Sequence, residues 1–525
     1  MKRWLLALTG LLLLLAPLKF SVPVNLQSLA VPPPGPLEWL FWSWPNQLCV
    51  MTAAVLVLLL AVKPQPSLLG LLPVLWLVTQ AMAVPTAICW QTAVDTLLHF
   101  GACVAVFYAA ARCAREPGWE NWLLGALAVA TLLVCLMALE QHFGGLDATR
   151  QYAAGQANLS DAMRLKLTSR RVFGPFASPN SLAGFLALAF VPVLAWLGTK
   201  TSKVLVVVLA GGVMVVCVAL SGSRGGFVAL VAGALVWLAS WKCPRWWRWG
   251  LVMLLVVAVG IGLIHRGASS LEARLDYWGG AVRIIGDYPW LGTGPGTFGS
   301  IYPKYKVALT EEAQLVHNNF LQMWSDSGVM AFVVFAAMWG VGLWRAARQN
   351  NAPLLAALVS WTVHGLLDFD LYVPGIALPA FALLGVVHGS SRDSQAMAGH
   401  WRWLCVALAA AAVWFEGRML AATVAYGRGD SVAAVRWAPR NPHYWTALQS
   451  EEGCQKAVEL DPMRSSRHAR LARAHWVAGK HELALAEFRQ AVALNPTEQS
   501  YREELKSAEE SVRQGRGGLL QSRPF

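Results

Sequence analysis

The sequence predicts an all-α, polytopic membrane helix bundle with a C-terminal helical tail, on three observations. Of the 525 residues, 56% are hydrophobic and only 14% are charged, whereas a soluble globular protein carries about 25% charged residues. Long apolar runs recur up to about residue 424, and the composition then turns polar. The nine cysteines include no CxxC motif. The composition therefore excludes a wholly soluble enzyme, a disordered protein and a disulfide scaffold, and it gives no sign of a zinc site.

The apolar runs that approach the length of a bilayer crossing number about 13. They are 4–18, 48–62, 68–88, 97–111, 121–139, 181–198, 203–220, 225–241, 249–264, 328–344, 353–367, 374–388 and 403–424. The first run follows two basic residues as a signal peptide does, but no clean cleavage site follows it. We therefore expect a retained helix and divide the chain into a membrane domain, 1–424, and a tail, 425–525.

The basic residues predict the orientation of these helices. If the N-terminus is cytoplasmic, every short inside loop carries Lys or Arg, whereas the short outside loops are nearly free of them. The net charge of +13 then reflects anchoring at the cytoplasmic surface, and we expect no nucleic-acid partner. This orientation puts the two long polar loops, 140–180 and 265–327, and the C-terminal tail on the outer side.

The tail contains two similar segments, AVELDP at 457–462 and AVALNP at 491–496, which lie 34 residues apart. That spacing is the tetratricopeptide period, and the residues between predict two amphipathic helices, 468–477 and 482–493. The tail resembles a tetratricopeptide repeat, which would offer a docking surface to a protein partner or an acceptor; the alternative is a helical hairpin without a ligand. Because so few repeats are marginally stable alone, we expect the tail to pack on the membrane domain.

Two outer segments bring arginines to the membrane surface. Arg170 and Arg171 precede a Gly- and Pro-rich entry to the helix that opens near Asn180, and a helix N-terminus favours an anion. Arg224 lies in SGSRGG, 221–226, between two apolar runs, and a guanidinium is the preferred planar ligand of phosphate. The alternatives are a helix cap at Asn180 or its neighbour with solvated arginines, and an Arg224 that reaches the lipid headgroups.

The outer loop 265–327 carries a third arginine. Arg274 and Trp278 share one face of a predicted amphipathic helix at the membrane interface. The later run Gly294-x-Gly296-x-x-Gly299 formally matches a dinucleotide fingerprint. We reject that interpretation because no βαβ unit surrounds the glycines.

His317 opens the helix that re-enters the membrane, beside Asn318. A neutral imidazole can take a proton from an attacking hydroxyl, although His317 could instead cap the helix or bond a loop carbonyl. Asp368 and Asp370 form an acidic pair at a short outer loop, one turn after His364. Asn318, Asp368 and Asp370 are therefore candidates for orienting an arginine or binding an acceptor; the carboxylates could also simply be solvated. One histidine and two carboxylates are too few ligands to indicate a metal site, and we expect no metal.

The order of these motifs resembles the O-antigen ligase and O-antigen polymerase superfamily over roughly 48–390. The motifs are Phe176-x-x-Pro179-Asn180-x-x-Ala183, Ser221-x-Ser223-Arg224-Gly225-Gly226, Arg274-x-x-x-Trp278, Gly292-x-Gly294-x-Gly296-x-Phe298 and His317-Asn318-x-Phe320-Leu321. The combined order is fairly specific, whereas each motif alone is not. The tetratricopeptide-like tail is not part of this pattern.

The resemblance implies a membrane glycosyltransferase of the GT-C type at the periplasmic face of the bacterial inner membrane. Its donor would be an undecaprenyl-diphosphate-linked glycan, it would use neither metal nor nucleotide, and it would have no cofactor. His317 would activate the acceptor hydroxyl, Arg224 and Arg274 would bind the diphosphate, and Arg170 or Arg171 would add to that site. The acceptor would be lipid A core for a ligase, a second lipid-linked glycan for a polymerase, or a protein.

The residues support the same chemistry without the resemblance. A donor on a membrane lipid brings its leaving diphosphate to the surface, where arginines would stabilise the departing charge. A base opposite the leaving group predicts inversion at the anomeric carbon. A polysaccharide transporter is a rival hypothesis, since intramembrane Arg and His also mark transport pathways, but we find no repeated half in the sequence. A membrane-anchored scaffold would leave the outer Arg and His residues unexplained.

Overall fold

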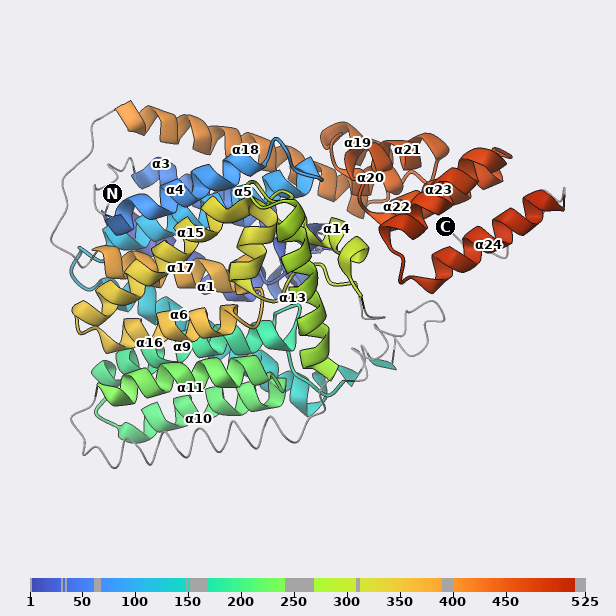
Figure 1. Ribbon diagram of the computed structural model, residues 1–525. Helices are drawn as coiled ribbons and strands as arrows, with labels where there is room; N and C mark the ends of the chain where they lie inside the picture. The colour runs from blue at the N-terminus through green and yellow to red at the C-terminus, as the bar shows by residue number, and fades with distance from the viewer. Residues whose placement is uncertain are drawn as a thin grey trace.

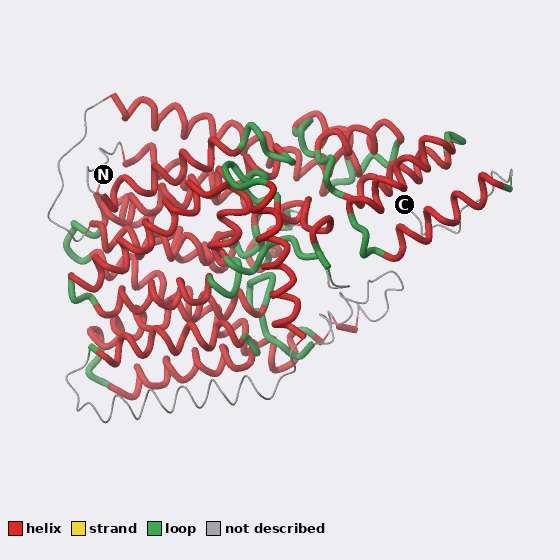
Figure 2. The backbone as a smooth tube through the Cα atoms, viewed as in Figure 1, coloured by secondary structure: helices red, strands yellow, loops and turns green. Residues whose placement is uncertain are grey.

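The computed structural model describes residues 2–29, 32–33, 35–60, 68–147, 150–151, 169–240, 269–307, 312–389 and 400–514. Within these ranges every regular element is a helix and none is a strand, as Figure 2 shows. The all-α fold class predicted from the sequence is confirmed. The helices of the bundle run side by side, and the tail projects from one end of it (Figure 1).

The described helices of the membrane part have the following bounds: α1 (Lys2–Lys19), η1 (Val24–Leu29), α2 (Pro36–Phe41), α3 (Asn46–Leu60), α4 (Leu68–Ala83), α5 (Trp90–Cys113), α6 (Trp119–Glu140), η2 (Gln141–Gly145), α9 (Pro179–Lys200), α10 (Val204–Ser221), α11 (Arg224–Ala239), α13 (Ser269–Asp287), α14 (Phe298–Tyr305), α15 (Asn319–Arg348), α16 (Ala352–Gly365), η3 (Asp370–Tyr372), α17 (Pro374–Gly389) and α18 (His400–Gly427). The tail contains α19 (Ser431–Trp437), α20 (Pro442–Thr446), α21 (Glu451–Leu460), α22 (Ser465–Val477), α23 (His481–Leu494) and α24 (Gln499–Arg513).

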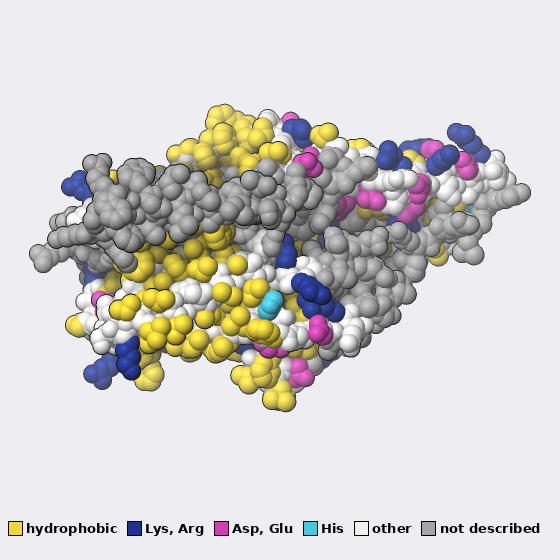
Figure 3. All heavy atoms as spheres, turned by 90° about the horizontal axis from the view of Figure 1, so that it is seen from below, with side chains coloured by type: hydrophobic (Ala, Val, Ile, Leu, Met, Phe, Trp, Pro, Cys, Tyr) yellow, Lys and Arg dark blue, Asp and Glu magenta, His cyan; other side chains and the backbone are white. Residues whose placement is uncertain are grey.

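Every predicted apolar run that falls on described residues coincides with a helix; the run 249–264 lies outside the described residues. Within the described ranges, six helices are long and apolar enough to cross a bilayer: α5, α6 with η2, α9, α10, α15 and α18. Shorter apolar helices, among them α11, α16 and α17, pack between them. The protein is therefore a multi-pass membrane protein. Hydrophobic side chains also cover much of the bundle surface seen in Figure 3, as expected for a surface that faces lipid.

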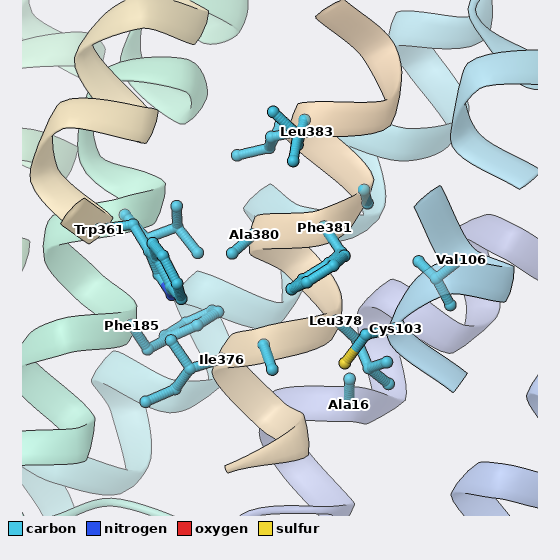
Figure 4. Packing of buried hydrophobic residues seen from close by; sticks show 14 of the residues in the cluster. Ala16, Cys103, Val106, Phe185, Trp361, Ile376, Leu378, Ala380, Phe381 and Leu383 are labelled. Carbon is cyan, nitrogen blue, oxygen red and sulfur yellow. The ribbon is translucent and has the colours of Figure 1, made fainter. Parts of the chain in front are cut away.

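Helix α17 forms the centre of the bundle. All its residues from Pro374 to Gly389 are buried, and it packs against α5, α1, α16, α15 and α9. Figure 4 shows Ile376 beside Phe185 of α9 on one side and Leu378 near Cys103 of α5 on the other. Glycines allow the closest of these approaches, because a Cβ at Gly385 would lie 2.1 Å from a carbonyl oxygen of α5. Small residues at a helix interface let two backbones meet in this way.

Helix α15 is discontinuous, and the loop between α13 and α14 forms hydrogen bonds with α15 at the break. Gly328 has φ +82, a left-handed conformation that favours glycine. The loop fills the break: the Gly294 amide donates to the Asp326 carbonyl at 2.7 Å, and the Val329 amide donates to the Pro289 carbonyl at 3.0 Å. The Asp326 carboxylate, which is fully buried, accepts from the Gly296 amide at 2.9 Å. The loop with the glycine-rich run thus supplies hydrogen-bond partners for the backbone groups of α15 that the break leaves without helical partners.

The tail packs on the bundle end that carries α13 and α14, as expected. Asn495 donates to Glu312 at 2.6 Å, and Arg464 donates to Ser300 of α14 at 3.2 Å. The Arg440 guanidinium lies 4.4 Å from the ring centre of Trp90 at the start of α5. Helices α22 and α23 confirm the two helices predicted from the repeated segments, while the tetratricopeptide assignment stays a prediction.

Candidate functional site

The residues singled out in the sequence meet at the end of the bundle nearer the tail. Helices α9, α11 and α15 begin at this end with Pro179, Arg224 and Asn319, and α13 runs across it beside α14 (Figure 1). Helices α9 and α15 finish at the opposite end with Lys200 and Arg348, two of the basic residues that predict the cytoplasmic side. The candidate site and the basic loops therefore lie at opposite ends of the same helices.

His317 sits at the centre of the candidate site. Its φ of +56 is a left-handed conformation that costs free energy for a residue other than glycine, and such outliers cluster at functional sites. Trp278 donates to its carbonyl at 3.4 Å, so that the helix face predicted to carry Arg274 does reach this segment. The imidazole stacks on Tyr277 and meets the edge of Phe369. The side chain stays 25% exposed, so a substrate can reach it.

Asp368 joins His317 to Arg274. Its Oδ1 lies 3.1 Å from His317 Nδ1, and its Oδ2 lies 3.8 Å from the Arg274 guanidinium. The carboxylate is only 2% exposed, so the alternative of a solvated loop residue is wrong for Asp368. Burial alone raises the pKa of this carboxyl, but its interactions with His317, His364 and Arg274 outweigh burial and hold the pKa below its usual range. Asp368 is therefore an ionised carboxylate beside the imidazole and the guanidinium.

Asp370 and Asn318 have other partners. The Asp370 carboxylate lies 2.6 Å from Nδ1 of His364, and both side chains are 1% exposed. Asp370 is therefore not solvated either, and it faces into the bundle. Asn318 is the N-cap of α15, since its Oδ1 accepts from the amides of Phe320 and Leu321 at 3.0 and 3.1 Å. The cap predicted as an alternative for His317 thus belongs to Asn318.

Arg224 lies beside the loop that carries Asp368. It is the first residue of α11, after the cap Ser223, whose hydroxyl accepts from the Gly226 amide at 3.1 Å. A Cβ at Gly225 would lie 3.4 Å from Leu367, the residue before Asp368. The helix therefore starts against this loop, and its N-terminus adds positive electrostatic potential beside the guanidinium.

Arg170 and Arg171 are both exposed, and Arg171 connects the first two arginine motifs. The Arg171 guanidinium donates to the Ser221 carbonyl at 2.6 Å and to Asn180 Oδ1 at 3.0 Å. The cap of α9 is Ser178, so the alternative of a helix cap at Asn180 or Ser181 is wrong. Arg171 thus holds the start of α9 to the end of α10, which leads into α11 beside the loop with Asp368.

Several residues of the site were missed in the sequence. Tyr277 and Phe369 enclose the imidazole, and Tyr372 donates to Asp326 at 3.0 Å. The signal for Asp326 was present, because it is the one acidic residue within the sequence of α15.

Among the described residues, no group of three or more His, Cys, Asp or Glu side chains is arranged to hold a metal ion. The described arginines at this end of the bundle include Arg171, Arg224 and Arg274.

Comparisons with known proteins match the part of the chain that carries the candidate site. A family model described as O-antigen ligase matches residues 209–336, a segment that contains Arg224, Arg274 and His317. The chain is 22% identical over 314 residues to a general O-oligosaccharyltransferase of Acinetobacter baylyi, which covers 53% of this chain and 51% of that protein. It is 27% identical over 222 residues to an O-antigen ligase of Pseudomonas aeruginosa, which covers 39% of this chain and 50% of that protein.

The chain spans about half the length of these curated relatives. The matched segment begins within α10 and ends within α15, and so includes α11, α13 and the loop that carries His317. The family match, the two relatives and the apolar helical bundle agree with one another. Within residues 209–336 the chain is therefore similar to O-antigen ligases, and the two relatives support the resemblance to the O-antigen ligase superfamily.

Proposed function

We propose that the protein transfers a glycan from an undecaprenyl-diphosphate carrier to an acceptor hydroxyl at the periplasmic face of the bacterial inner membrane. The observation that carries the proposal is the partly exposed imidazole of His317, whose Nδ1 lies 3.1 Å from the ionised Asp368 next to Arg274. A base and a guanidinium that share one carboxylate suit a reaction in which a hydroxyl is deprotonated while a negative charge departs nearby.

His317 is the proposed general base. Asp368 lies at Nδ1 and favours the tautomer with the proton there, which leaves the lone pair of Nε2 for the acceptor hydroxyl. The acceptor oxygen forms a bond to the anomeric carbon as its proton passes to Nε2. The bond from that carbon to the diphosphate oxygen breaks, and the diphosphate leaves with the electron pair. Attack opposite the leaving group inverts the anomeric configuration.

The arginines are the proposed diphosphate ligands. Arg274 is 13% exposed and stands beside Asp368, Arg224 begins α11 by the same loop, and Arg171 lies at the adjoining end of α10. Guanidinium groups donate paired hydrogen bonds to phosphate oxygens, and the α11 N-terminus adds to the favourable potential. The reaction needs no metal in this proposal, since guanidinium groups compensate the charge of the leaving diphosphate.

Two classes of acceptor are open within this function. For a ligase, the acceptor is the lipid A core or a similar glycan. The relative named general O-oligosaccharyltransferase aligns with the larger share of this chain, 53% against 39%, and favours an O-linked protein glycosyltransferase as the second candidate. In either case the tail, which packs against the loop before His317, is well positioned to receive the acceptor.

The test is a His317→Ala variant in cells that still make and flip the lipid-linked glycan. We expect the lipid-linked glycan to accumulate and the transferred glycan to disappear, with the amount of membrane protein unchanged. His142→Ala is the matched control, because His142 is an exposed histidine in η2 that has no place in the proposed site. Normal transfer in the His317 variant would remove the proposed function of this residue, and a product with retained anomeric configuration would contradict the mechanism.

A further inference from the structure

A polar cavity of about 210 Å³ lies between the membrane bundle and the tail, apart from the His317 cluster. Its bundle wall comes from η1, α3, α5 and α18, and its tail wall comes from α20, the segment that follows α21 and the start of α22. Among its lining residues are Asn25, Gln47, Gln91, Thr92, Asn441 and His443. The volume is below the roughly 300–1,000 Å³ of sites for drug-sized ligands, and it suits one small polar unit of a larger molecule.

The charges that line this cavity compensate one another. Two arginines and two carboxylates line the cavity. The Asp461 carboxylate forms ion pairs with both arginines, at 3.1 Å from Arg464 and 3.0 Å from Arg467. Burial opposes ionisation of Asp461, but the two arginines lower the pKa of its carboxyl below the usual range. The remaining carboxylate in the lining is that of Asp95, which accepts from Gln91 at 2.8 Å. Because its arginines are already engaged, the cavity does not select a phosphate or another anion.

Three polar atoms of the lining residues have no hydrogen-bond partner within the described part of the chain: Asn25 Oδ1, His443 Nε2 and Asp461 Oδ1. Burial, assisted by nearby arginines, lowers the pKa of His443 to about 4, so the ring is neutral at pH 7. His443 packs its ring against Tyr426 and Tyr444. Amides, hydroxyls, a neutral imidazole and aromatic rings provide the mixture of donors, acceptors and apolar faces that hydroxyl-rich, uncharged ligands need.

The cavity is connected to the candidate site through the chain itself. Gln314 lines the cavity, and its side chain accepts from Arg464 at 3.4 Å. Asn25 donates to the Gln314 carbonyl at 3.1 Å, so the bundle and the tail both hold this residue. Gln314 precedes His317 by three residues, which an extended chain spans in at most about 11 Å. A glycan whose reacting end is at His317 can therefore place another of its sugars near this cavity.

We propose that the cavity between η1, α5 and α20 is a saccharide subsite that binds one neutral sugar unit of a glycan substrate. The inference rests on the proposed function for the identity of that substrate, but binding of a sugar to the cavity can be measured without any transfer. The sugar could belong to the glycan of the donor or to the acceptor, since both present the same hydroxyl chemistry.

Binding is tested by saturation-transfer NMR on the full-length protein in detergent. The probes are the methyl glycosides of glucose, galactose and N-acetylglucosamine, with inorganic phosphate as the anionic comparison. We expect at least one glycoside to bind, and His443→Phe, which keeps a ring and removes Nε2, to weaken that binding about tenfold, as loss of one buried hydrogen bond does. Thr92→Val is the second variant, because it removes a hydroxyl from the lining and keeps the shape of the side chain.

The matched control is His481→Phe, the same replacement at a tail histidine that does not line the cavity. Absence of binding by all three glycosides overturns the proposal, and so does equal binding by wild type and both cavity variants. In a transfer assay, a higher KM for the donor in His443→Phe assigns the subsite to the donor glycan, and a higher KM for the acceptor assigns it to the acceptor. If neither KM changes, the subsite has no role in transfer. Normal transfer by His317→Ala together with intact glycoside binding would reject the proposed function and retain the subsite.

Discussion

Two histidine–aspartate pairs meet at one loop of this protein, and they differ in exposure. His317 faces Asp368 at 3.1 Å and is 25% exposed, whereas His364 faces Asp370 at 2.6 Å and is 1% exposed. The two carboxylates are separated by a single residue. The same pair of functional groups thus forms once at the surface of the candidate site and once inside the bundle. The comparison shows that the surroundings of a pair, and not its chemistry alone, decide whether it can act on a substrate.

The packing of the bundle explains the difference. We call His317 and Asp368 the outer pair, and His364 and Asp370 the inner pair. A Cβ at Gly184 would lie 2.6 Å from Nδ1 of His364, so α9 packs directly over the inner pair. His317, in contrast, is held in a left-handed backbone conformation between aromatic rings and retains an open side. We therefore assign the inner pair to stability and the outer pair to the proposed transfer reaction.

The largest expected effects come from matched glutamine variants of the two histidines. His317→Gln should lower transfer by about 10²–10⁴-fold, the usual contribution of a general base, and should destabilise the protein less than His364→Gln, because Arg274 still lies beside Asp368. His364→Gln should destabilise the protein by about 3–5 kcal/mol, because it leaves Asp370 as an uncompensated buried charge. Transfer by each purified variant and its thermal unfolding in detergent measure both effects. The comparison fails if the two variants lose activity and stability in the same proportion.

The next effect concerns the proposed diphosphate ligands. Arg274→Lys and Arg224→Lys keep the charge but lose the planar fork of donors, so transfer should fall by about 10²–10³-fold, as after loss of one preorganised donor. Arg283→Lys is the control, since Arg283 lies on the same helix α13, is exposed and donates to the Tyr305 carbonyl. Immunoblots of the membranes check the amount of protein. Full activity in both site variants would show that these arginines take no part in the reaction assigned to His317 and Asp368.

Asp368→Asn tests how the outer pair works. The variant removes the charge that, in the proposed mechanism, sets the His317 tautomer, so transfer should fall while acceptor KM changes little. It should also remove a pH-dependent stabilisation. Because the folded-state pKa of Asp368 lies below its usual value, the ionised carboxylate stabilises the fold above about pH 4 and loses this contribution as the pH falls through the folded-state pKa.

The stability difference between wild type and Asp368→Asn should therefore be constant from neutral pH to about pH 5 and should shrink only below about pH 4. Thermal unfolding as a function of pH measures it. A difference that grew as the pH fell would have the wrong sign for a carboxyl with a lowered pKa, and the assigned role of Asp368 would then be incorrect.

The smallest effect is expected where the tail docks. Arg464→Ala removes hydrogen bonds to Ser300 and Gln314 and should weaken docking by about 1 kcal/mol, as loss of a hydrogen-bonded partner does. Limited proteolysis should then cleave between bundle and tail more rapidly. Arg489→Ala is the control, because Arg489 is exposed and pairs with Glu509 within the tail. Equal cleavage in both variants would mean that Arg464 does not hold the tail.

The sequence predicted the parts of the molecule that depend on local composition. Apolar runs gave the helices, and Arg224, Arg274 and His317 were conspicuous because charged residues are costly near a membrane. The break in α15 was not predicted, because Gly328 is unremarkable until the loop from Pro289 occupies the gap. Nor could Asp368 be told apart from Asp370: only the packing of α9 over His364 shows which carboxylate faces inward. Such distinctions arise from tertiary contacts and leave no periodic pattern in the chain.

The most direct test of the account is the single-turnover rate of glycan transfer by purified His317→Ala, preloaded with lipid-linked donor, against wild type under the same conditions. The account predicts a rate about 10²–10⁴-fold lower, with donor binding unchanged because the arginines remain in place. A rate within about twofold of wild type, a difference of only about 0.4 kcal/mol in the barrier, would contradict it.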